Sequence, residues 1–261
     1  MQITGATRLM HILADPVDHI QVTAVLNSRF EAWQVDVGVT ALHVAGTNLP
    51  IVVSALRVMQ NLVGCGVTIP HKIAIMPLLD ECSERAQMIG AVNWLRREPS
   101  GALIGDNFDG VGFMAGLARD GVNVAGKRVM LVGAGGAARA IAFALGETAS
   151  HLTILNRSRD KADLLGSAVN AAFSSCAVST APADPAEFDL VVNGTSLGMK
   201  VDDALPIDVA NLTPRTTVAE IVMRPARTPL VVAAEERGCK VVLGRRMLDE
   251  QFGAVRAFMR L

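Results

Sequence analysis

Short runs of apolar and β-branched residues alternate along this chain with segments of helical periodicity. The strand-like runs are TRLMHILA, QVDVGVTAL, GCGVTI, AVNWLRR and ALIGDN, followed later by HLTILNR, FDLVVNGT, TTVAEIVM and CKVVLG. Apolar residues recur at helical spacing in 20–33, 49–62, 72–87 and 111–120. This βαβα alternation predicts a parallel sheet covered by helices, which is the α/β class.

A glycine-rich turn in the middle of the chain indicates how the domains are organised. GAGGAA at 133–138 follows the strand KRVMLV, opens the helix ARAIAFALG and fits G-x-G-x-x-G/A. A dinucleotide fingerprint that begins only at residue 133 implies a complete module ahead of it. We therefore predict two domains with a boundary near 108–112, an N-terminal α/β domain over 1–109 and a Rossmann-type NAD(P)-binding domain over 110–246.

Three residues of the glycine turn have specific predicted roles. Gly133 allows the tight turn, Gly135 lets the backbone approach a pyrophosphate, and the small Ala138 lets helix and strand pack closely. The helix that follows offers N–H groups and a positive dipole end to phosphate, and we assign Gly136 and Ala137 to cofactor binding as well. A glycine turn that binds nothing is the competing interpretation.

The end of the next strand bears on the choice of cofactor. An acidic residue there would bind the ribose 2′-hydroxyl of NAD, but this chain has Asn156, Arg157, Ser158 and Arg159. Arginines can pair with a 2′-phosphate, so the sequence favours NADP and leaves NAD open. Farther on, VVNGTSLGM at 191–199 ends a strand at the carboxyl edge, where Thr195, Gly198 and Met199 could approach the nicotinamide.

Composition excludes several classes of partner. Apolar residues make up 51% and charged residues 19% of the 261 positions, and the net charge of −1 gives no basic footprint for nucleic acid. No apolar run reaches the length of a membrane span, and the first residues do not resemble a signal peptide. The scattered cysteines predict free thiols and a cytoplasmic protein. We expect a small-molecule substrate and no metal site, and the sequence leaves a homodimer open.

Three motifs carry the candidate substrate chemistry: GVTIPHK at 66–72, IGAVNWL at 89–95 and GDNFDGVGF at 105–113. We read each as the end of a short strand that supplies groups able to hydrogen-bond a polyol. These groups are Thr68, Lys72, Asn93 and Asp109. A single lysine or aspartate is usually a solvated surface charge, but strand ends just ahead of a dinucleotide domain favour a site.

Taken in order, the motifs resemble those of the shikimate/quinate dehydrogenase family. The shared elements are VTIPHK, GAVN, an N-x-D-G-x-G-F run at 107–113, GAGGAA, an N-R-[ST] turn, N-x-T-S-x-G-M, P-x-x-T-P-L at 225–230 and a terminal M-L-x-x-Q at 247–251. The resemblance covers nearly the whole chain. It implies that the first domain binds a hydroxylated cyclic carboxylate, that the second binds NAD(P), and that helix 247–261 completes the first domain.

The resemblance also assigns roles to individual residues. It implies that Lys72 and Asp109 are the catalytic pair and that Thr68, Asn93 and Gln251 contact the substrate. Oxidation of a secondary alcohol releases a hydroxyl proton as hydride leaves the carbon, so a nearby group must accept that proton. A partly desolvated lysine beside a carboxylate can do so, because burial lowers its pKa and the acid favours its charged form.

The chain departs from the family in the segment that holds the substrate carboxylate. The family pattern P-[IV]-x-H-S-x-S-P supplies two serines for this purpose, whereas this chain has Ile20 and Val22 at those positions. A buried carboxylate without its charge-assisted hydrogen bonds loses on the order of a few kcal/mol. We therefore expect poor use of shikimate. A polar edge could be rebuilt by Asp18, His19, Gln21 and Thr23, of which we assign His19 and Gln21 to substrate binding.

Four further departures lie in the other motifs. Gly66 stands where the family has asparagine, Trp94 and Phe108 where it has threonine, and Met223 where it has tyrosine. Two other functions compete with an NAD(P)-dependent dehydrogenase: a non-catalytic dinucleotide sensor, and an enzyme acting on another redox substrate such as a folate. An intact Lys72 and Asp109 argue against the sensor, and the few aromatic residues argue against the folate.

Overall fold

The computed structural model describes residues 2–18, 20–200 and 202–261 of the chain. It forms two compact units, the first made of Met1–Phe108 with Gly253–Leu261 and the second of Asp109–Phe252. The last helix, α9 (Arg245–Met259), contributes residues to both units. Each unit is an α/β layer structure with its own sheet.

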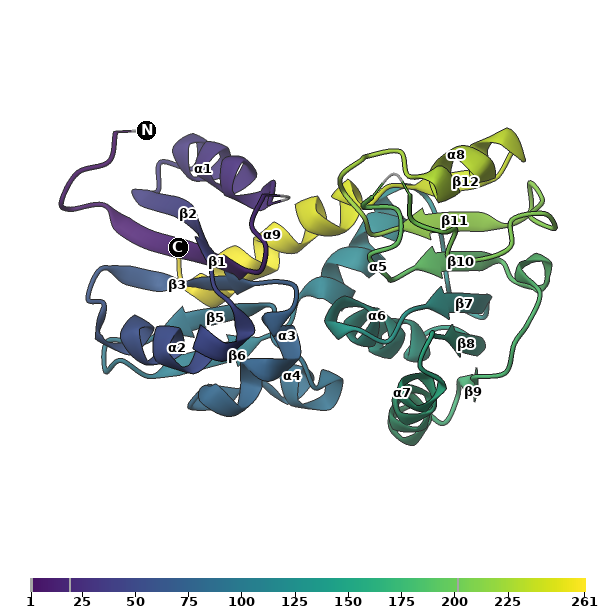
Figure 1. Ribbon diagram of the computed structural model, residues 1–261, viewed down its shortest axis with the longest axis horizontal. Helices are drawn as coiled ribbons and strands as arrows, with labels where there is room; N and C mark the ends of the chain where they lie inside the picture. The colour runs from purple at the N-terminus through teal and green to yellow at the C-terminus, as the bar shows by residue number, and fades with distance from the viewer. Residues whose placement is uncertain (1, 19, 201) are drawn as a thin grey trace. The chain divides into compact units, whose positions relative to one another are not determined.

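The first unit is built on a six-stranded sheet in the order β2-β1-β3-β5-β6-β4, and Figure 1 shows β1 between β2 and β3. Its strands are β1 (Arg8–Ala14), β2 (Val37–His43), β3 (Leu62–Val67), β4 (Glu81–Cys82), β5 (Trp94–Arg97) and β6 (Leu103–Asp106). The pairs β1–β2, β1–β3 and β4–β6 are parallel, whereas β5 is antiparallel to both β3 and β6. The wholly parallel sheet expected from the sequence is therefore wrong at β5. The cause is local, because a short connection around Gly101, at φ +92°, joins β5 to β6 as a hairpin.

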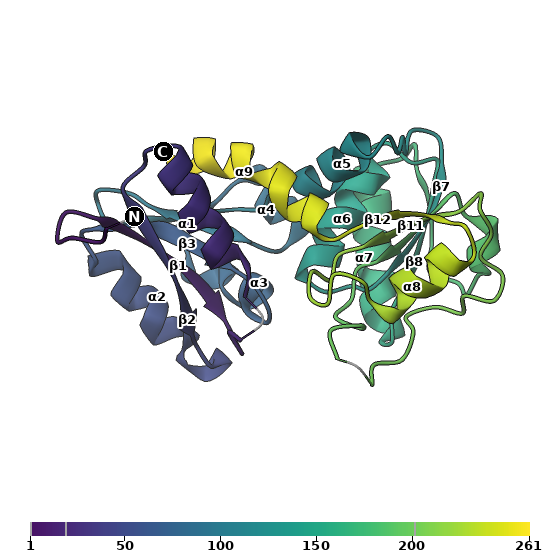
Figure 2. The same ribbon diagram turned by 90° about the horizontal axis from the view of Figure 1, so that it is seen from above.

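Helices cover both faces of the first sheet. They are α1 (Val22–Ala32), α2 (Leu49–Val58), α3 (His71–Ala74) and α4 (Glu84–Ile89), with 3₁₀ turns at Gly46–Asn48 and Met76–Leu78. Figure 2 shows α1 and α2 on opposite faces of the sheet. The buried face of α2 packs on Leu13 of β1 and Val67 of β3, while α1 buries Leu26 and Phe30.

The segment 72–87 is not the continuous helix that its periodicity suggested. Pro77 lies within a 3₁₀ turn, since proline has no N–H for the helical ladder. The chain then pairs briefly as β4 and begins a new helix, α4, at Glu84. Ser83 caps α4, because its hydroxyl accepts a hydrogen bond from the N–H of Ala86 at 3.1 Å.

The second unit is a parallel sheet with the strand order β12-β11-β10-β7-β8-β9. Its strands are β7 (Arg128–Val132), β8 (His151–Leu155), β9 (Ala177–Ser179), β10 (Leu190–Asn193), β11 (Thr217–Glu220) and β12 (Lys240–Val242). Figure 1 shows β11 and β12 at one end of this sheet and β8 and β9 at the other. Numbered within the unit, this order is 3-2-1-4-5-6, the arrangement of dinucleotide-binding folds.

Helices of the second unit pack on this sheet and on one another. They are α5 (Asp109–Arg119), α6 (Gly136–Gly146), α7 (Arg159–Ala172), α8 (Pro229–Glu236) and the first residues of α9, with a 3₁₀ turn at Pro185–Glu187. The strands β7 and β10 are buried almost throughout, as expected for central parallel strands.

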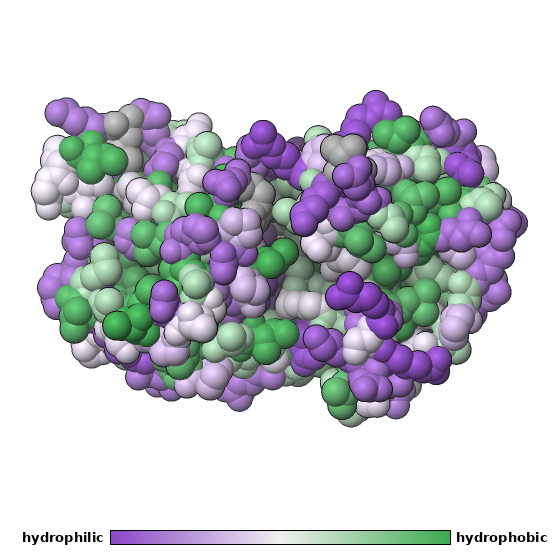
Figure 3. All heavy atoms as spheres, in the orientation of Figure 1, coloured by the Kyte–Doolittle hydropathy of each residue, from purple (hydrophilic) through white to green (hydrophobic). Residues whose placement is uncertain are grey.

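The surface of each unit mixes polar and apolar residues over the face drawn in Figure 3. The four cysteines are free thiols, and burial raises the pKa of Cys65 to about 12. None of the helices formed by the described residues is both long and apolar enough to span a bilayer.

Candidate functional site

The antiparallel strand β5 brings three of the sequence motifs to one edge of the first sheet. The carboxyl ends of β3 and β6 lie at this edge, and so does the amino end of β5, because β5 runs the other way. Asn93 therefore precedes a strand rather than ending one, which corrects the expectation from the sequence. Its carbonyl accepts a hydrogen bond from Val67 N at 2.7 Å, and its N–H donates to the carbonyl of Asp106 at 3.0 Å.

The Asn93 side chain is fixed by the start of the next motif. Its Oδ1 accepts a hydrogen bond from the N–H of Phe108 at 2.8 Å, which orients the amide, and the residue is only 4% exposed. The Phe108 ring packs against Phe258 at 5.5 Å between centroids, and the Arg85 guanidinium lies 4.6 Å from its centre. These contacts anchor Phe108, and the next residue, Asp109, is buried and opens α5.

Lys72 lies in the short helix α3 rather than at a strand end. Its neighbour His71 is 1% exposed and shares a 2.7 Å hydrogen bond between its Nε2 and the carbonyl of Val44. The carbonyl of Lys72 accepts from the N–H of Val92 at 2.8 Å, and the Lys72 side chain is half-buried. The backbone that carries this lysine is therefore held on both sides.

A tryptophan and a glycine replace two polar residues of the family on neighbouring strands. Trp94 pairs with Gly66 across β5 and β3, and it is 3% exposed. A Cβ at Gly66 would lie 2.7 Å from Cδ1 of Ile12 and 3.1 Å from the nearest Trp94 ring carbon. Ile12 and the Trp94 ring therefore fill the space into which a side chain at position 66 would extend, so the glycine makes room for the tryptophan.

The remaining residues assigned to substrate binding are spread over several elements. Thr68 directly follows β3 and donates its N–H to the carbonyl of Leu13 at 3.0 Å. Ile20 and Val22 are half-buried at the start of α1, with the exposed Gln21 between them. Gln251 lies in α9, is 4% exposed and donates from Nε2 to the carbonyl of Met247 at 3.2 Å. His19 lies outside the described residues.

The glycine turn of the second unit has the geometry that a pyrophosphate needs. Gly133 adopts φ +120°, and a Cβ there would lie 2.8 Å from the carbonyl oxygen of Gly194, so a side chain would meet both strain and a clash. A Cβ at Gly135 would meet nothing within 4 Å, which leaves open space beside the backbone. Helix α6 begins at Gly136, and no side chain caps it. Its first N–H groups can therefore receive an anion, and these residues fit a dinucleotide.

The basic turn after β8 precedes α7. Asn156 Nδ2 donates to the carbonyl of Ser158 at 2.9 Å, which stabilises the turn. Arg157 is exposed, whereas Arg159 forms an ion pair with Asp163 one helical turn later, at 3.7 Å. Of the two arginines, Arg157 is the better placed to receive a 2′-phosphate, because Arg159 already has a carboxylate partner.

The loop after β10 contacts the glycine turn. A Cβ at Gly133 would lie 3.2 Å from Cγ2 of Thr195, so these two predicted cofactor residues are neighbours at the switch point between β7 and β10. Sequence reasoning missed two buried residues that support this loop, Asn193 at the end of β10 and Glu220 at the end of β11. The signal available was a polar residue closing each apolar strand, in LVVN and TVAE.

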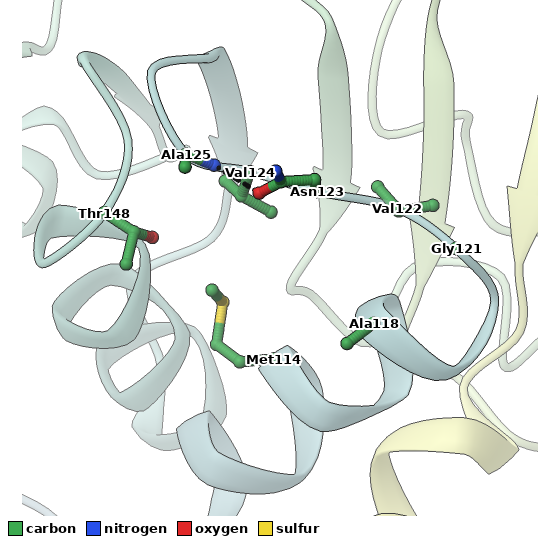
Figure 4. A pocket seen from close by; sticks show the side chains of 8 residues that line it. All are labelled: Met114, Ala118, Gly121, Val122, Asn123, Val124, Ala125 and Thr148. Atoms are coloured by element: carbon green, nitrogen blue, oxygen red, sulfur yellow. Dashed lines mark hydrogen bonds between the residues drawn. The ribbon is translucent and has the colours of Figure 1, made fainter.

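A hollow of about 390 Å³ also occurs in the second unit, lined by Met114 and Ala118 of α5, residues 121–125 and Thr148 (Figure 4). Residues 121–125 precede β7, so this hollow lies toward the amino ends of the strands. Ligands of open α/β sheets bind at the carboxyl ends. The hollow is therefore not the candidate site.

Fold and site together define the class of this protein: a two-unit α/β protein whose second unit carries a Rossmann-type dinucleotide turn. Comparison with known proteins narrows this class. The protein-family model of the shikimate dehydrogenase substrate binding domain matches residues 12–95. The protein-family model of shikimate / quinate 5-dehydrogenase matches residues 116–211. The shikimate dehydrogenase (NADP(+)) of Lysinibacillus sphaericus is 39% identical over 249 residues, which cover 94% of this chain and 88% of that protein. The chain belongs to the shikimate dehydrogenase family.

Solved structures agree with this assignment. A shikimate dehydrogenase crystallised in complex with NADP+ superposes with a TM-score of 0.92 at 30% identity, covering 99% of this chain and 91% of that one. The ligand-free 5-ketofructose reductase of Gluconobacter sp. strain CHM43 superposes with a TM-score of 0.84 at 31% identity, covering 97% and 92%. The family and the Rossmann-type second unit predicted from the sequence are confirmed.

Proposed function

We propose that this protein is an NADP-dependent oxidoreductase that transfers hydride reversibly between the nicotinamide and a secondary alcohol of a cyclic polyol or hydroxy acid. The observation that carries this proposal is the glycine turn at the switch point of a 3-2-1-4-5-6 sheet. The chain belongs to the shikimate dehydrogenase family, and NADP+ is named for two of the chain's relatives, which supports the same function. NADP, when bound, supplies the hydride acceptor or donor.

Lys72 is the proposed proton shuttle. It accepts the hydroxyl proton when the alcohol is oxidised and returns a proton when the ketone is reduced. The hydrogen bonds at the backbone of α3 support this role, because they fix the origin of a long and otherwise mobile side chain.

Asp109 and Asn93 are the proposed partners of Lys72 in this chemistry. Asp109 would accept a hydrogen bond from the reacting hydroxyl and so orient it for proton transfer. Asn93, whose Oδ1 accepts from Phe108 N, would donate from Nδ2 to a substrate hydroxyl. Thr68, Gln21, His19 and Gln251 are proposed further substrate contacts.

The proposed substrate differs from shikimate at its carboxylate. Ile20 and Val22 offer no hydrogen bonds where the family pattern has serines. An uncharged polyol or keto sugar has no carboxylate that needs hydrogen bonds at these positions. A substrate whose carboxylate binds elsewhere also does not need them. The similarity to a reductase named for 5-ketofructose, an uncharged sugar, supports this substrate class.

The proposed cofactor preference rests on Arg157. NAD carries a 2′-hydroxyl where NADP carries a phosphate, and the exposed guanidinium of Arg157, in the turn after β8, would pair with that phosphate. Gly135, Gly136, Ala137, Asn156 and Ser158 complete the proposed phosphate contacts, and Thr195, Gly198 and Met199 those at the nicotinamide end.

Absorbance at 340 nm tests the proposed function directly. The protein is incubated with NADP+ or NAD+ and with shikimate, quinate and a panel of uncharged polyols. The expected result is NADPH formation with at least one polyol or hydroxy acid. Tight binding of NADP+ with no reduced product on any substrate would instead favour a dinucleotide sensor and would contradict an enzyme.

A further inference from the structure

The second unit contains a buried carboxylate that the proposed chemistry does not use. Glu220 closes β11, is 1% exposed and accepts hydrogen bonds from three segments of the chain. Asn193 Nδ2 lies 2.9 and 3.0 Å from its two oxygens, Val222 N lies 2.8 Å from Oε1, and Thr228 Oγ1 lies 2.8 Å from Oε2. Burial raises the pKa of Glu220, while these donors act against that rise by stabilising the carboxylate.

Asn193, which is hydrogen-bonded to Glu220, also forms hydrogen bonds with the loop after β10. Its Nδ2 also donates to the carbonyl of Leu197 at 3.0 Å. Its Oδ1 accepts from the N–H of Thr195 at 3.1 Å and from the Thr195 hydroxyl at 2.7 Å. The same hydroxyl accepts from Leu197 N at 3.0 Å. One side chain, oriented by Glu220, therefore fixes the loop at both Thr195 and Leu197.

Thr228 supports the far end of the same loop. It is fully buried, caps α8 by accepting from Val231 N at 3.3 Å, and donates to Glu220. Gly198 adopts φ +101°, and a Cβ there would lie 3.0 Å from Cβ of Thr228. Glu220 is thus bonded to both side chains against which the 194–198 loop rests.

The 194–198 loop follows β10, and this position indicates which half of the cofactor it faces. The glycine turn follows β7, and the turn that reads the adenosine ribose follows β8. A dinucleotide crosses the switch point between β7 and β10, so its second half lies over the ends of β10 and β11. The loop at 194–198 therefore faces the nicotinamide half of the cofactor.

We propose that Glu220 is a positioning residue for hydride transfer, which holds the 194–198 loop through Asn193 and Thr228 in the conformation that receives the nicotinamide. This inference rests on the proposed function. A purely structural carboxylate would support the fold of the second unit as a whole and would have no preference for one half of the cofactor.

The Glu220→Gln variant separates these two roles. It keeps the size of the side chain but places an amide N–H₂ against groups that already donate, Asn193 Nδ2 or the Thr228 hydroxyl. Three quantities are measured. They are kcat with NADP+ and the polyol or hydroxy acid that the wild type oxidises, affinity for NADP+, and affinity for 2′,5′-ADP, which lacks the nicotinamide. Because a displacement of about 1 Å at a reacting group can cost on the order of 10²-fold, kcat should fall roughly 10- to 100-fold. Affinity for 2′,5′-ADP should stay within about twofold of wild type.

A second pair of variants keeps the test decisive if Glu220→Gln does not fold. Thr228→Val removes the hydroxyl and keeps the shape, whereas Thr228→Ser keeps the hydroxyl and serves as the matched control. Thr228→Val should lower kcat several-fold relative to Thr228→Ser, again with unchanged affinity for 2′,5′-ADP.

Other outcomes overturn the inference in distinguishable ways. An unchanged kcat in Glu220→Gln, or an equal loss of affinity for NADP+ and 2′,5′-ADP, would show that Glu220 does not act on the nicotinamide half. A wild-type protein that binds neither compound would overturn the proposed function itself, and the inference with it.

Discussion

The apolar pair at the start of α1 gives the sharpest prediction about substrate choice. We expect the Ile20→Ser, Val22→Ser double variant to gain activity on shikimate. Each hydroxyl would offer the carboxylate one charge-assisted hydrogen bond, which contributes about 1.5–3 kcal/mol. Both positions are half-buried, so solvent screening favours the lower end of that range, about 3 kcal/mol for the pair. This free energy corresponds to roughly a 10²-fold rise in kcat/KM.

The assay is steady-state NADPH formation from shikimate, compared with an uncharged polyol on which the wild type is active. The double variant should gain on shikimate and not on the polyol. Ala24→Ser is the matched control, because it adds a hydroxyl to the same helix at an exposed position. Thermal unfolding checks that the loss of two apolar side chains has not unfolded α1.

Two results would show that Ile20 and Val22 do not limit the use of shikimate. A wild-type kcat/KM for shikimate above about 10⁴ M⁻¹s⁻¹, within the range of ordinary enzymes, would mean that the carboxylate needs no serines here. An equal gain from Ala24→Ser would mean that any added hydroxyl has the same effect.

The other predictions concern cofactor choice, packing and pH. Arg157→Ala should weaken NADP+ binding roughly 10- to 100-fold and NAD+ binding far less, as measured by titration of each; equal losses would remove the arginine from 2′-phosphate recognition. Gly66→Ala should destabilise the fold by about 1–3 kcal/mol in denaturant unfolding, because its Cβ would press on Cδ1 of Ile12 and on the ring of Trp94. Combined with Trp94→Leu, it should cost less than the sum of the single changes, and strict additivity would contradict the contact. Burial lowers the pKa of His11, so its contribution to stability is complete above about pH 6.5 and is lost as the pH falls through the folded-state pKa. Relative to His11→Gln, the wild-type free energy of unfolding should therefore decrease on acidification below about pH 6.5, and parallel pH curves would refute this.

The second unit was the more predictable of the two from the sequence. The glycine turn has local requirements, a preceding strand, a tight turn and a helix, and all of them can be read within 133–138 and its flanks. Parallel strands buried on both faces also read as continuous apolar runs, which made β7 and β10 easy to recognise.

The first unit was harder to predict from the sequence, because its arrangement depends on the direction in which strand β5 runs. Periodicity finds the strand around residues 94–97 but says nothing of whether it runs parallel or antiparallel to its neighbours. The reversed strand is what brings Asn93 to the edge where β3 ends. The compensation between Gly66 and Trp94 depends on strand register, which is a non-local property.

Glu220 shows a third limit of sequence reasoning. Its importance comes from bonds to Asn193 and Thr228, which lie 27 and 8 residues away in the chain. A single glutamate that closes an apolar run has no local feature that separates it from a surface charge. Only the fold, which buries it beneath the loop, makes the hydrogen-bond network visible.

Lys72 is proposed to carry the proton in the redox reaction, and kcat and NADP+ affinity, both measured for Lys72→Ala, test this role. Lys240→Ala, an exposed lysine at the start of β12, is the matched control. Lys72→Ala should lower kcat by about 10²–10⁴-fold and leave NADP+ affinity nearly unchanged, while Lys240→Ala should change neither. Turnover retained in Lys72→Ala, or a fall no larger than that in Lys240→Ala, would contradict it.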